Sequence, residues 1–363
     1  MYGVALVAYC RAGFEGEAAA DLRRIAARAP VTLELSAVPS SGYVIAQAEA
    51  FDDAAWKRAE SAVSPIFTRS VFVGIGPVAL LSPQPVAAPA DRVTPLLAAI
   101  DKLTRVLSES PPWRSVWIEF PDTNDGKELS TLARALGSRL EGALRSKGQL
   151  DAGAKRRLHV FLLDGGTAFV GTSDAHHTAW PMGIPRLYMP GSAPSRSTLK
   201  LAEAFVTLLG ERDAALLRPG LRAVDLGAAP GGWTWQLAQR GLKVTAVDNG
   251  PLKGSVATDP LVTHVREDGL RWRPKRTVDW VTCDIVERPL RIAELMAHWI
   301  ADGAARRAIF NLKLPMKKRY DEVQRCEQRI GEILTRAKVR YSLRIRQLYH
   351  DREEVTGYLA TKD

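Results

Sequence analysis

The strongest chemical signal in the chain is the turn D-L-G-A-A-P-G-G-W, from Asp225 to Trp233. Gly227, Gly231 and Gly232 lack a Cβ atom, so this segment can bend sharply and bring main-chain N–H groups against a ligand. An apolar run before it and a helical pattern after it place the turn where a doubly wound sheet binds its ligand. The spacing G-x-x-x-G-G differs from the dinucleotide fingerprint and from the phosphate-binding loop. Neither a nicotinamide cofactor nor a nucleoside triphosphate is therefore expected.

Three acidic residues at or after this turn narrow the choice of ligand. Asp225 is at the entrance of the turn, where a carboxylate repels a pyrophosphate but pairs with the ammonium of an amino acid group. Asp248 ends the next predicted strand and is placed to accept hydrogen bonds from ribose hydroxyls. Asp268 follows a further strand-like segment, where it can meet an adenine edge. Ribose, adenine and an amino acid together predict S-adenosylmethionine as the cofactor.

Methyl transfer to a hydroxyl needs a group that removes the proton. Asp284 ends one apolar strand, and Lys313 ends the next, Ala308 to Leu312, so both are expected to face one cleft. A free lysine is protonated at neutral pH, but partial burial and a neighbouring positive charge, such as Lys200 or a bound sulfonium, can lower its pKa. Lys313 is therefore predicted to accept the proton.

Other acceptors and a metal centre have little support in the sequence. Amino-group methylation commonly uses an (N/D)-P-P-(Y/F) turn, whereas this chain has D-I-V after Cys283. Methylation at cytosine C5 needs a reactive cysteine, but Cys283 lies inside an apolar strand and is expected to be core. His176 and His177 are adjacent and have no third ligand at metal-binding spacing, so no metal is predicted.

A chain of 363 residues predicts more than one domain, and the elements that must carry these residues divide it accordingly. Residues 1–180 are expected to be an α+β region, with a break between subdomains near the Pro-rich stretch 83–92. Residues 181–197 carry prolines and glycines without period and predict a linker. The predicted elements of the first region are strands 3–9, 42–48, 116–120 and 158–163 and helices 14–29, 52–63, 93–108 and 127–147.

Residues 198–363 show the strand–helix alternation of a Rossmann-like domain with a doubly wound, mostly parallel sheet. Two further strands are predicted near the end, at 339–349 and 355–360, joined by the charged turn D-R-E-E. The other predicted elements of this region are helices 199–209 and 233–240 and strands 221–226, 243–248, 280–284 and 308–312.

Charge and cysteine content indicate the partner and the compartment. Lys and Arg exceed Asp and Glu by 50 to 40, a net charge of +10, which favours a polyanionic partner such as nucleic acid. Lys317, Lys318 and Arg319 follow Lys313 directly and are expected to contact phosphates. Three scattered cysteines fit a reducing cytoplasm. No signal peptide or membrane-spanning run is recognisable, and no apolar helix face calls for a partner, so a cytoplasmic monomer is predicted.

Beyond these derivations, the turn at Asp225 resembles that of the FtsJ-type 2′-O-ribose RNA methyltransferases. Within that group, the chain is most similar to the bacterial enzymes that methylate 23S rRNA. The resemblance covers most of the chain and is carried by several strings. These are P-S-R-S-T-L-K-L-A-E-A-F (194–205), F-N-L-K-L-P-M-K-K-R-Y (310–320), R-Q-L-Y-H-D-R-E-E-V-T (346–356), Y-C-R-A-G-F-E (9–15), D-T-N-D-G-K-E-L (122–129) and M-G-I-P-R-L (182–187).

The resemblance implies a THUMP-type RNA-binding N-terminal half and a methyltransferase that modifies a cytidine ribose in the peptidyl transferase loop of 23S rRNA, naked or in a precursor particle. Another RNA class, such as tRNA, is the alternative substrate, and an RNA-binding factor with a vestigial cofactor site is a third hypothesis. The implied tetrad includes Glu354, although the sequence leaves Glu353 open. Its members are Lys200, Asp284, Lys313 and Glu354. The implied cofactor contacts are Ser197, Ala229, Pro230, Gly231, Gly232, Asp248, Asp268 and Asp284.

Overall fold

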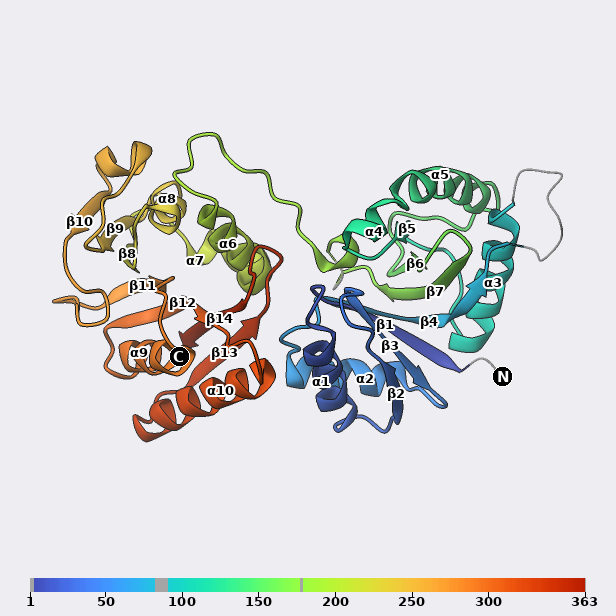
Figure 1. Cartoon of the computed structure of the whole chain (residues 1–363), viewed down its shortest axis with the longest axis horizontal. Helices are drawn as coiled ribbons and strands as arrows, with labels where there is room; N and C mark the ends of the chain where they lie inside the picture. Colours follow the sequence, from blue (N-terminus) through green and yellow to red (C-terminus); the bar gives the residue numbers. More distant parts are fainter. Residues whose placement is uncertain (1–2, 82–90, 177–178, 363) are drawn as a thin grey trace. The chain divides into compact units, whose positions relative to one another are not determined.

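The computed structural model describes residues 3–81, 91–176 and 179–362. The chain forms two compact units, Met1–Pro185 and Arg186–Asp363 (Figure 1). Most of the break predicted near 83–92 falls outside the described residues. Each unit has its own sheet and its own hydrophobic core.

The first unit is α+β, with one seven-stranded sheet in the order β2-β3-β1-β4-β7-β6-β5. Its neighbours are antiparallel except for β5 and β6, which are parallel. In chain order its elements are β1 (Val4–Tyr9), α1 (Glu15–Ala26), β2 (Leu33–Ser36), β3 (Tyr43–Ala48), α2 (Asp53–Val63), β4 (Ser70–Ala79), α3 (Val93–Leu107), β5 (Val116–Glu119), α4 (Asn124–Lys127), α5 (Ser130–Ser146), β6 (Arg156–Leu162) and β7 (Thr167–Asp174).

Alternation along the strands explains how this unit builds its core. Leu6 and Ala8 of β1 pack with residues of α1 and α2, because every second residue of a strand faces the same side. Val160 of β6 and Val170 of β7 pack in the same way with residues of α3 and α5. Two hydrophobic clusters therefore lie beneath two pairs of helices.

The second unit has a seven-stranded sheet in the order β10-β9-β8-β11-β12-β14-β13. The first five strands are parallel, and β14 runs antiparallel to both of its neighbours. The predicted Rossmann-like fold is confirmed. Its elements are α6 (Ser197–Ala204), a π-helical turn (Phe205–Leu209), α7 (Asp213–Leu216), β8 (Arg222–Leu226), α8 (Gly232–Ala238), β9 (Lys243–Val247), β10 (Val262–Val265), β11 (Val278–Cys283), α9 (Pro289–Ala301), β12 (Ala305–Lys313), α10 (Arg319–Arg336), β13 (Tyr341–Arg346) and β14 (Glu354–Thr361), with short 3-10 turns at Gly210–Arg212 and Gly254–Thr258. A further 3-10 turn, Pro181–Gly183, belongs to the first unit.

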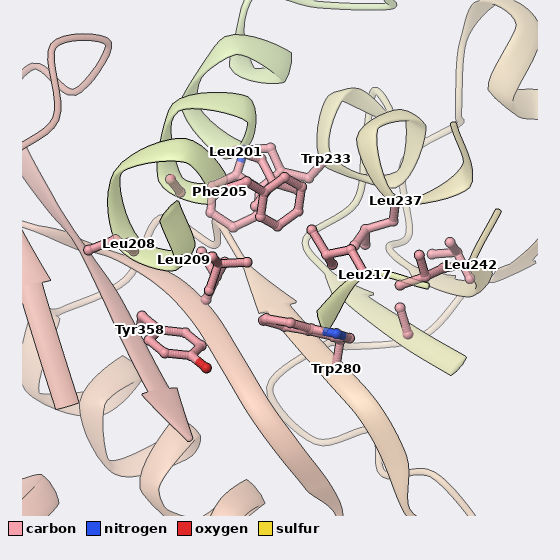
Figure 2. Close-up of a cluster of buried hydrophobic side chains, with 14 of the residues drawn as sticks. Leu201, Phe205, Leu208, Leu209, Leu217, Trp233, Leu237, Leu242, Trp280 and Tyr358 are labelled. Carbon is pink, nitrogen blue, oxygen red and sulfur yellow. The ribbon is translucent and has the colours of Figure 1, made fainter. Parts of the chain in front are cut away.

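A buried cluster fixes the helix that carries Lys200. Leu201 of α6 and Phe205 of the π-helical turn are fully buried and belong to one cluster with Trp280 of β11 and Tyr358 of β14 (Figure 2). The same cluster includes Trp233 of α8. Burial of side chains of this size stabilises the fold by about 1.5–3 kcal/mol each. This packing holds α6, and with it Lys200, against the sheet.

Several elements differ from the predictions. The helix expected over 127–147 is α5, which begins three residues later, and the short helix α4 before it was not predicted. A Cβ on Gly126 of α4 would meet the Pro121 carbonyl oxygen at 2.0 Å. Neither α9 nor α10 was predicted. In α10 the signal was present, because the buried Val323, Cys326 and Ile330 recur at three- and four-residue spacing. The short strand β2 alternates half-buried and exposed residues and has little apolar signal.

Candidate active site

Four charged side chains meet at one edge of the second sheet. Lys200 comes from α6, Asp284 directly follows β11, Lys313 ends β12 and Glu354 begins β14. Because β11 and β12 are parallel neighbours, their carboxyl ends bring Asp284 and Lys313 together. The antiparallel register pairs Lys313 directly with Glu354. These four side chains form one group, and Glu354 rather than Glu353 is its second acid.

Each lysine of the group contacts both acids. Lys313 Nζ lies 2.5 Å from Asp284 Oδ1 and donates a hydrogen bond to Glu354 Oε2. Lys200 Nζ pairs with Glu354 Oε1 and lies 3.7 Å from Asp284 Oδ2. The four formal charges cancel, which compensates for removing each of them from water. Glu353 lies outside the group, because its carboxylate pairs with Arg319 at 3.1 Å.

Burial and charge act in opposite directions on the pKa of Lys313. Burial lowers it, but the carboxylates of Asp284 and Glu354 outweigh burial, so the pKa is raised above the ordinary lysine value. In the protein by itself, burial and Lys200 therefore do not make Lys313 neutral, and the effect of a bound sulfonium on this pKa stays a prediction. Burial likewise raises the pKa of Glu354, but Lys313 and Lys200 outweigh it and the net pKa is lowered. Glu354 is thus an anion that holds the proton on Lys313.

A cavity of about 260 Å³ lies beside this group. Among the predicted cofactor residues, Ser197, Ala229 and Pro230 line it, together with Asp284. Gly227, one of the glycines that the sequence analysis placed against the ligand, lines it too. Sequence reasoning missed three further lining residues, Ser195, Ala228 and Trp233, although the last two lie within the glycine turn. The described lining contains one carboxylate and two hydroxyls but no Lys or Arg, so it suits a nucleoside with a positive charge better than a phosphate.

The glycines make this turn possible for steric reasons. Gly227 and Gly231 have φ values of 74° and 115°, in the region that side chains disfavour. Gly232 approaches the α6 N-terminus closely, and a Cβ there would lie 2.3 Å from Ser197 Oγ and 2.5 Å from Ser195 Oγ. Gly231 and Gly232 therefore shape the cavity without lining it.

Asp248 and Asp268, here called the two outer acids, differ in their surroundings. Both oxygens of Asp248 accept main-chain hydrogen bonds, from Ala229 N at 3.0 Å and from Gly250 N at 2.7 Å. Each carboxylate oxygen keeps a second lone pair, so a ribose hydroxyl can still be accepted. Asp268 is exposed and accepts a hydrogen bond from Leu270 N. Neither residue lines the cavity, and both cofactor contacts stay predictions.

Asp225 does not have the role expected of it. Its side chain is 1% exposed, and its oxygens accept hydrogen bonds from Thr234 Oγ1 at 2.6 Å and from Thr282 Oγ1 at 2.8 Å. Asp225 is also absent from the cavity lining. Contact with an ammonium group was therefore a wrong prediction, because this carboxyl ties β8 to α8 and β11 beneath the turn. Burial raises its pKa to about 7.

This burial has a measurable effect on stability. Between pH 4 and 7 the folded state holds a proton on Asp225 that the unfolded chain has lost, so stability falls as pH rises through this range. A rise from 3.8 to about 7 corresponds to roughly 4 kcal/mol. Asparagine cannot ionise, so Asp225→Asn should not lose stability in this way. We expect its free energy of unfolding to increase relative to that of the wild type as pH rises from 4 to 8. Urea unfolding of both proteins across this range measures it, and a pH-independent difference would contradict it.

Glu203 supports the group without belonging to it, and the sequence carried no sign of this. This residue of α6 is buried, and its carboxylate accepts hydrogen bonds from Tyr349 N at 2.7 Å and from His350 N at 2.9 Å. His350 Nδ1 lies 2.6 Å from the same carboxylate. Glu203 therefore clamps the turn after β13 to the helix that carries Lys200. That turn leads into Glu354.

Neither a metal centre nor a membrane-spanning helix is found among the described residues. They contain no group of three or more His, Cys, Asp or Glu side chains placed to hold a metal ion. Within the same ranges, no helix combines the length and the apolar character needed to cross a membrane.

Comparison with known proteins accounts for both units. Residues 193–315 match the FtsJ-like methyltransferase family. Residues 4–72 match the RlmM ferredoxin-like domain, and residues 91–174 match the N-terminal region of ribosomal RNA large subunit methyltransferase M. Neither N-terminal match is described as THUMP, so that part of the expectation stays a prediction. The FtsJ-like match, with the lining of the cavity, confirms S-adenosylmethionine as the cofactor.

Several relatives match this chain over nearly its whole length. A ribosomal RNA large subunit methyltransferase M from Laribacter hongkongensis is 47% identical, covering 96% of this chain and 95% of its own. One from Methylococcus capsulatus is also 47% identical, covering 98% and 97%, and one from Xylella fastidiosa is 44% identical, covering 97% of each. Among solved structures, TrmN from Thermus thermophilus is 16% identical, covers 99% of this chain and all of its own, and has a TM-score of 0.38. With such full-length relatives, and with three of the four charged residues of the site in the matched FtsJ-like segment, the chain belongs to the family of ribosomal RNA large subunit methyltransferase M.

Proposed function

We propose that this methyltransferase of the large-subunit rRNA methylates the 2′-hydroxyl of a cytidine in the peptidyl transferase loop of 23S rRNA. The observation that carries the proposal is the double position of Asp284, which lines the cofactor cavity and also contacts Lys313 at 2.5 Å. On this proposal Lys313, as the proton acceptor, lies directly beside the methyl donor. That arrangement suits an acceptor that must lose a proton, as a hydroxyl must.

The residues of the cavity fit S-adenosylmethionine. When bound, this cofactor supplies the methyl group on a positively charged sulfur. We assign Ser197, the turn from Ala229 to Gly232 and Asp284 to its immediate surroundings, and the two outer acids, Asp248 and Asp268, to its nucleoside. The carboxylate of Asp284 favours a cation at this place, because opposite charges within a few ångströms attract.

Lys313 is the proposed general base. To act as one, its amine must be neutral, whereas the acids around it hold the proton on in the protein by itself. A second positive charge in the adjoining cavity opposes that protonation and lowers the pKa. Asp284 and Glu354 then keep the Nζ atom in place, since both accept its hydrogen bonds. The hydroxyl proton passes to Nζ as the oxygen forms its new bond.

The acceptor and its position can be tested together. The purified protein is incubated with methyl-labelled S-adenosylmethionine and, separately, with naked 23S rRNA, a large-subunit precursor particle, finished large subunits or tRNA. We expect label in naked or precursor 23S rRNA, at a cytidine whose 3′ phosphodiester resists alkali, because a 2′-O-methyl group blocks that cleavage. Label on a base, or in tRNA alone, would refute the proposal.

Exposed lysines beside the site are proposed to contact RNA phosphates. Lys317 and Lys318 follow the Lys313 loop and are both exposed, and Lys318 immediately precedes α10. Arg319 differs from the expectation, because it is mostly covered and pairs with Glu353. Phosphate contact is therefore proposed for the two lysines alone.

This surface leads to a prediction about salt dependence. We expect the double variant Lys317→Ala/Lys318→Ala to bind RNA more weakly and to lower the slope of log affinity against log salt by roughly 1.4, or about 0.7 per lost contact with a single strand. Filter binding at several salt concentrations measures the slope. The matched control is Lys243→Ala/Lys275→Ala, the same charge change on exposed lysines at the amino ends of β9 and β11. Equal slopes in both double variants would rule out the assigned surface.

A further inference from the structure

A second set of side chains lies behind Asp284, on the side away from solvent. Asn311 of β12 and Thr356 of β14 are both fully buried and face each other across the antiparallel ladder. The next cross-strand pair on the same face is Lys313 with Glu354, two residues along each strand. The set therefore adjoins the catalytic group because of the sheet register.

Short contacts connect this set to Asp284. Asn311 Nδ2 lies 3.0 Å from Asp284 Oδ1, and Thr356 Oγ1 lies 2.8 Å from Asn311 Oδ1. Thr356 Oγ1 is also 3.2 Å and 3.0 Å from the two carboxyl oxygens of Asp351, a fully buried residue of the β13–β14 turn. Leu348 N donates a hydrogen bond to Asp351 Oδ2 at 2.9 Å.

The available hydrogens determine which atom donates in each of these hydrogen bonds. Asp284 Oδ1 accepts, so Asn311 must turn its NH₂ toward it and its carbonyl oxygen toward Thr356. That carbonyl oxygen only accepts, so the single hydroxyl proton of Thr356 is committed to it. Thr356 Oγ1 can then only accept from Asp351, which requires Asp351 to carry a proton.

The environment of Asp351 agrees with this count. Burial, followed by the nearby charge of Glu354, raises the pKa of Asp351 well above its ordinary value, and Glu203 adds to the rise. The opposing contributions, from Leu348 N and the Thr356 hydroxyl, are weaker. A neutral carboxyl that donates a hydrogen bond is the form that a buried site of this kind favours.

We propose that Asp351, Thr356 and Asn311 form a positioning chain in which the neutral carboxyl of Asp351 donates to Thr356, Thr356 donates to Asn311, and Asn311 donates to Asp284. The chain fixes the carboxylate of Asp284 while Asp284 contacts both Lys313 and the cofactor cavity. It also ties that carboxylate to the turn from which Glu354 emerges. The three residues touch neither substrate nor cofactor and act only through Asp284. Their catalytic effect rests on the proposed hydroxyl methylation.

The first test compares Thr356→Val with Thr356→Ser. Valine keeps the shape but leaves Asn311 without its donor, so Asp284 loses a fixed orientation. We expect kcat to fall roughly tenfold to a hundredfold, as for other small misplacements of reacting groups. The KM for RNA and the Kd for S-adenosylmethionine should stay within about twofold, because the residue contacts neither ligand. Thr356→Ser restores the hydroxyl and should restore kcat, which a role in packing alone would not require.

The second test asks whether Asp351 acts as a neutral donor. In Asp351→Asn the amide NH₂ can donate to Thr356 while its oxygen accepts from Leu348 N, so kcat should stay within about twofold of the wild type. The proposed positioning chain would be overturned if Thr356→Val kept the wild-type kcat. It would also be overturned if Asp351→Asn, at unchanged Tm, lost as much kcat as Thr356→Val. A wild type that methylates 23S rRNA on a base would instead remove the proposed function, so the two failures are distinguishable.

Discussion

We expect Lys313→Ala to lower kcat for methyl transfer by roughly 10²–10⁴, the usual contribution of a positioned general base. Alanine removes the proposed proton acceptor, while Asp284 and Glu354 stay paired with Lys200. The Kd for S-adenosylmethionine should change only a few-fold, since Lys313 does not line the cavity. Single-turnover methyl transfer and equilibrium cofactor binding measure the two quantities separately.

Lys313→Arg separates proton transfer from charge. Arginine keeps a cation between the two carboxylates but does not lose its proton at any accessible pH. If Lys313 is the base, the arginine variant should be nearly as slow as the alanine variant. Substantial activity in Lys313→Arg would show that the position supplies charge only, and the assignment of the base would fall.

The second large effect is on the pH profile. The acids around Lys313 raise its pKa, so the free enzyme holds the base in its protonated form until alkaline pH, and kcat/KM should rise as pH increases. Glu354→Gln removes one of the carboxylates that favour the charged amine. The pKa of Lys313 should then fall, and the rising limb of kcat/KM should move to lower pH.

The neighbouring acid provides the control for this shift. Glu353 is exposed and pairs with Arg319, outside the group around Lys313. Glu353→Gln removes the same charge one residue away and should leave the rising limb where it is in the wild type. If Glu354→Gln leaves the limb in place, or both variants move it equally, then Glu354 does not set the protonation of Lys313.

Parts of the site could be predicted because they depend on local chemistry. A glycine turn after an apolar strand needs main chain free of side-chain clashes, and Gly227, Gly231 and Gly232 carry that need in their residue type. The strand ends at Asp284 and Lys313 follow from apolar runs, and a parallel sheet brings such ends together. Lys200 and Glu354 had no comparable local signal and came from the resemblance to the FtsJ-type enzymes.

Other features depended on neighbours that are distant in sequence. Asp225, beside the glycines, was predicted to contact the ligand, but it accepts a hydrogen bond from Thr282 of another strand. A neutral Lys313 was expected from burial and a neighbouring positive charge, whereas in the protein by itself Asp284 and Glu354 raise its pKa. Arg319 was predicted to contact a phosphate, but its side chain pairs with Glu353, 34 positions further along the sequence.

The sequence by itself therefore determined the Rossmann-like fold, the cofactor class and the identity of the glycine turn. These follow from residue type and periodicity, which act over a few positions. Only the tertiary structure decided which acid joins Lys313, which carboxyl is buried, and where the proton of Asp351 must lie. Burial and hydrogen-bond direction belong to the packed neighbours of a group, and β12 and β14 become neighbours only when the sheet forms.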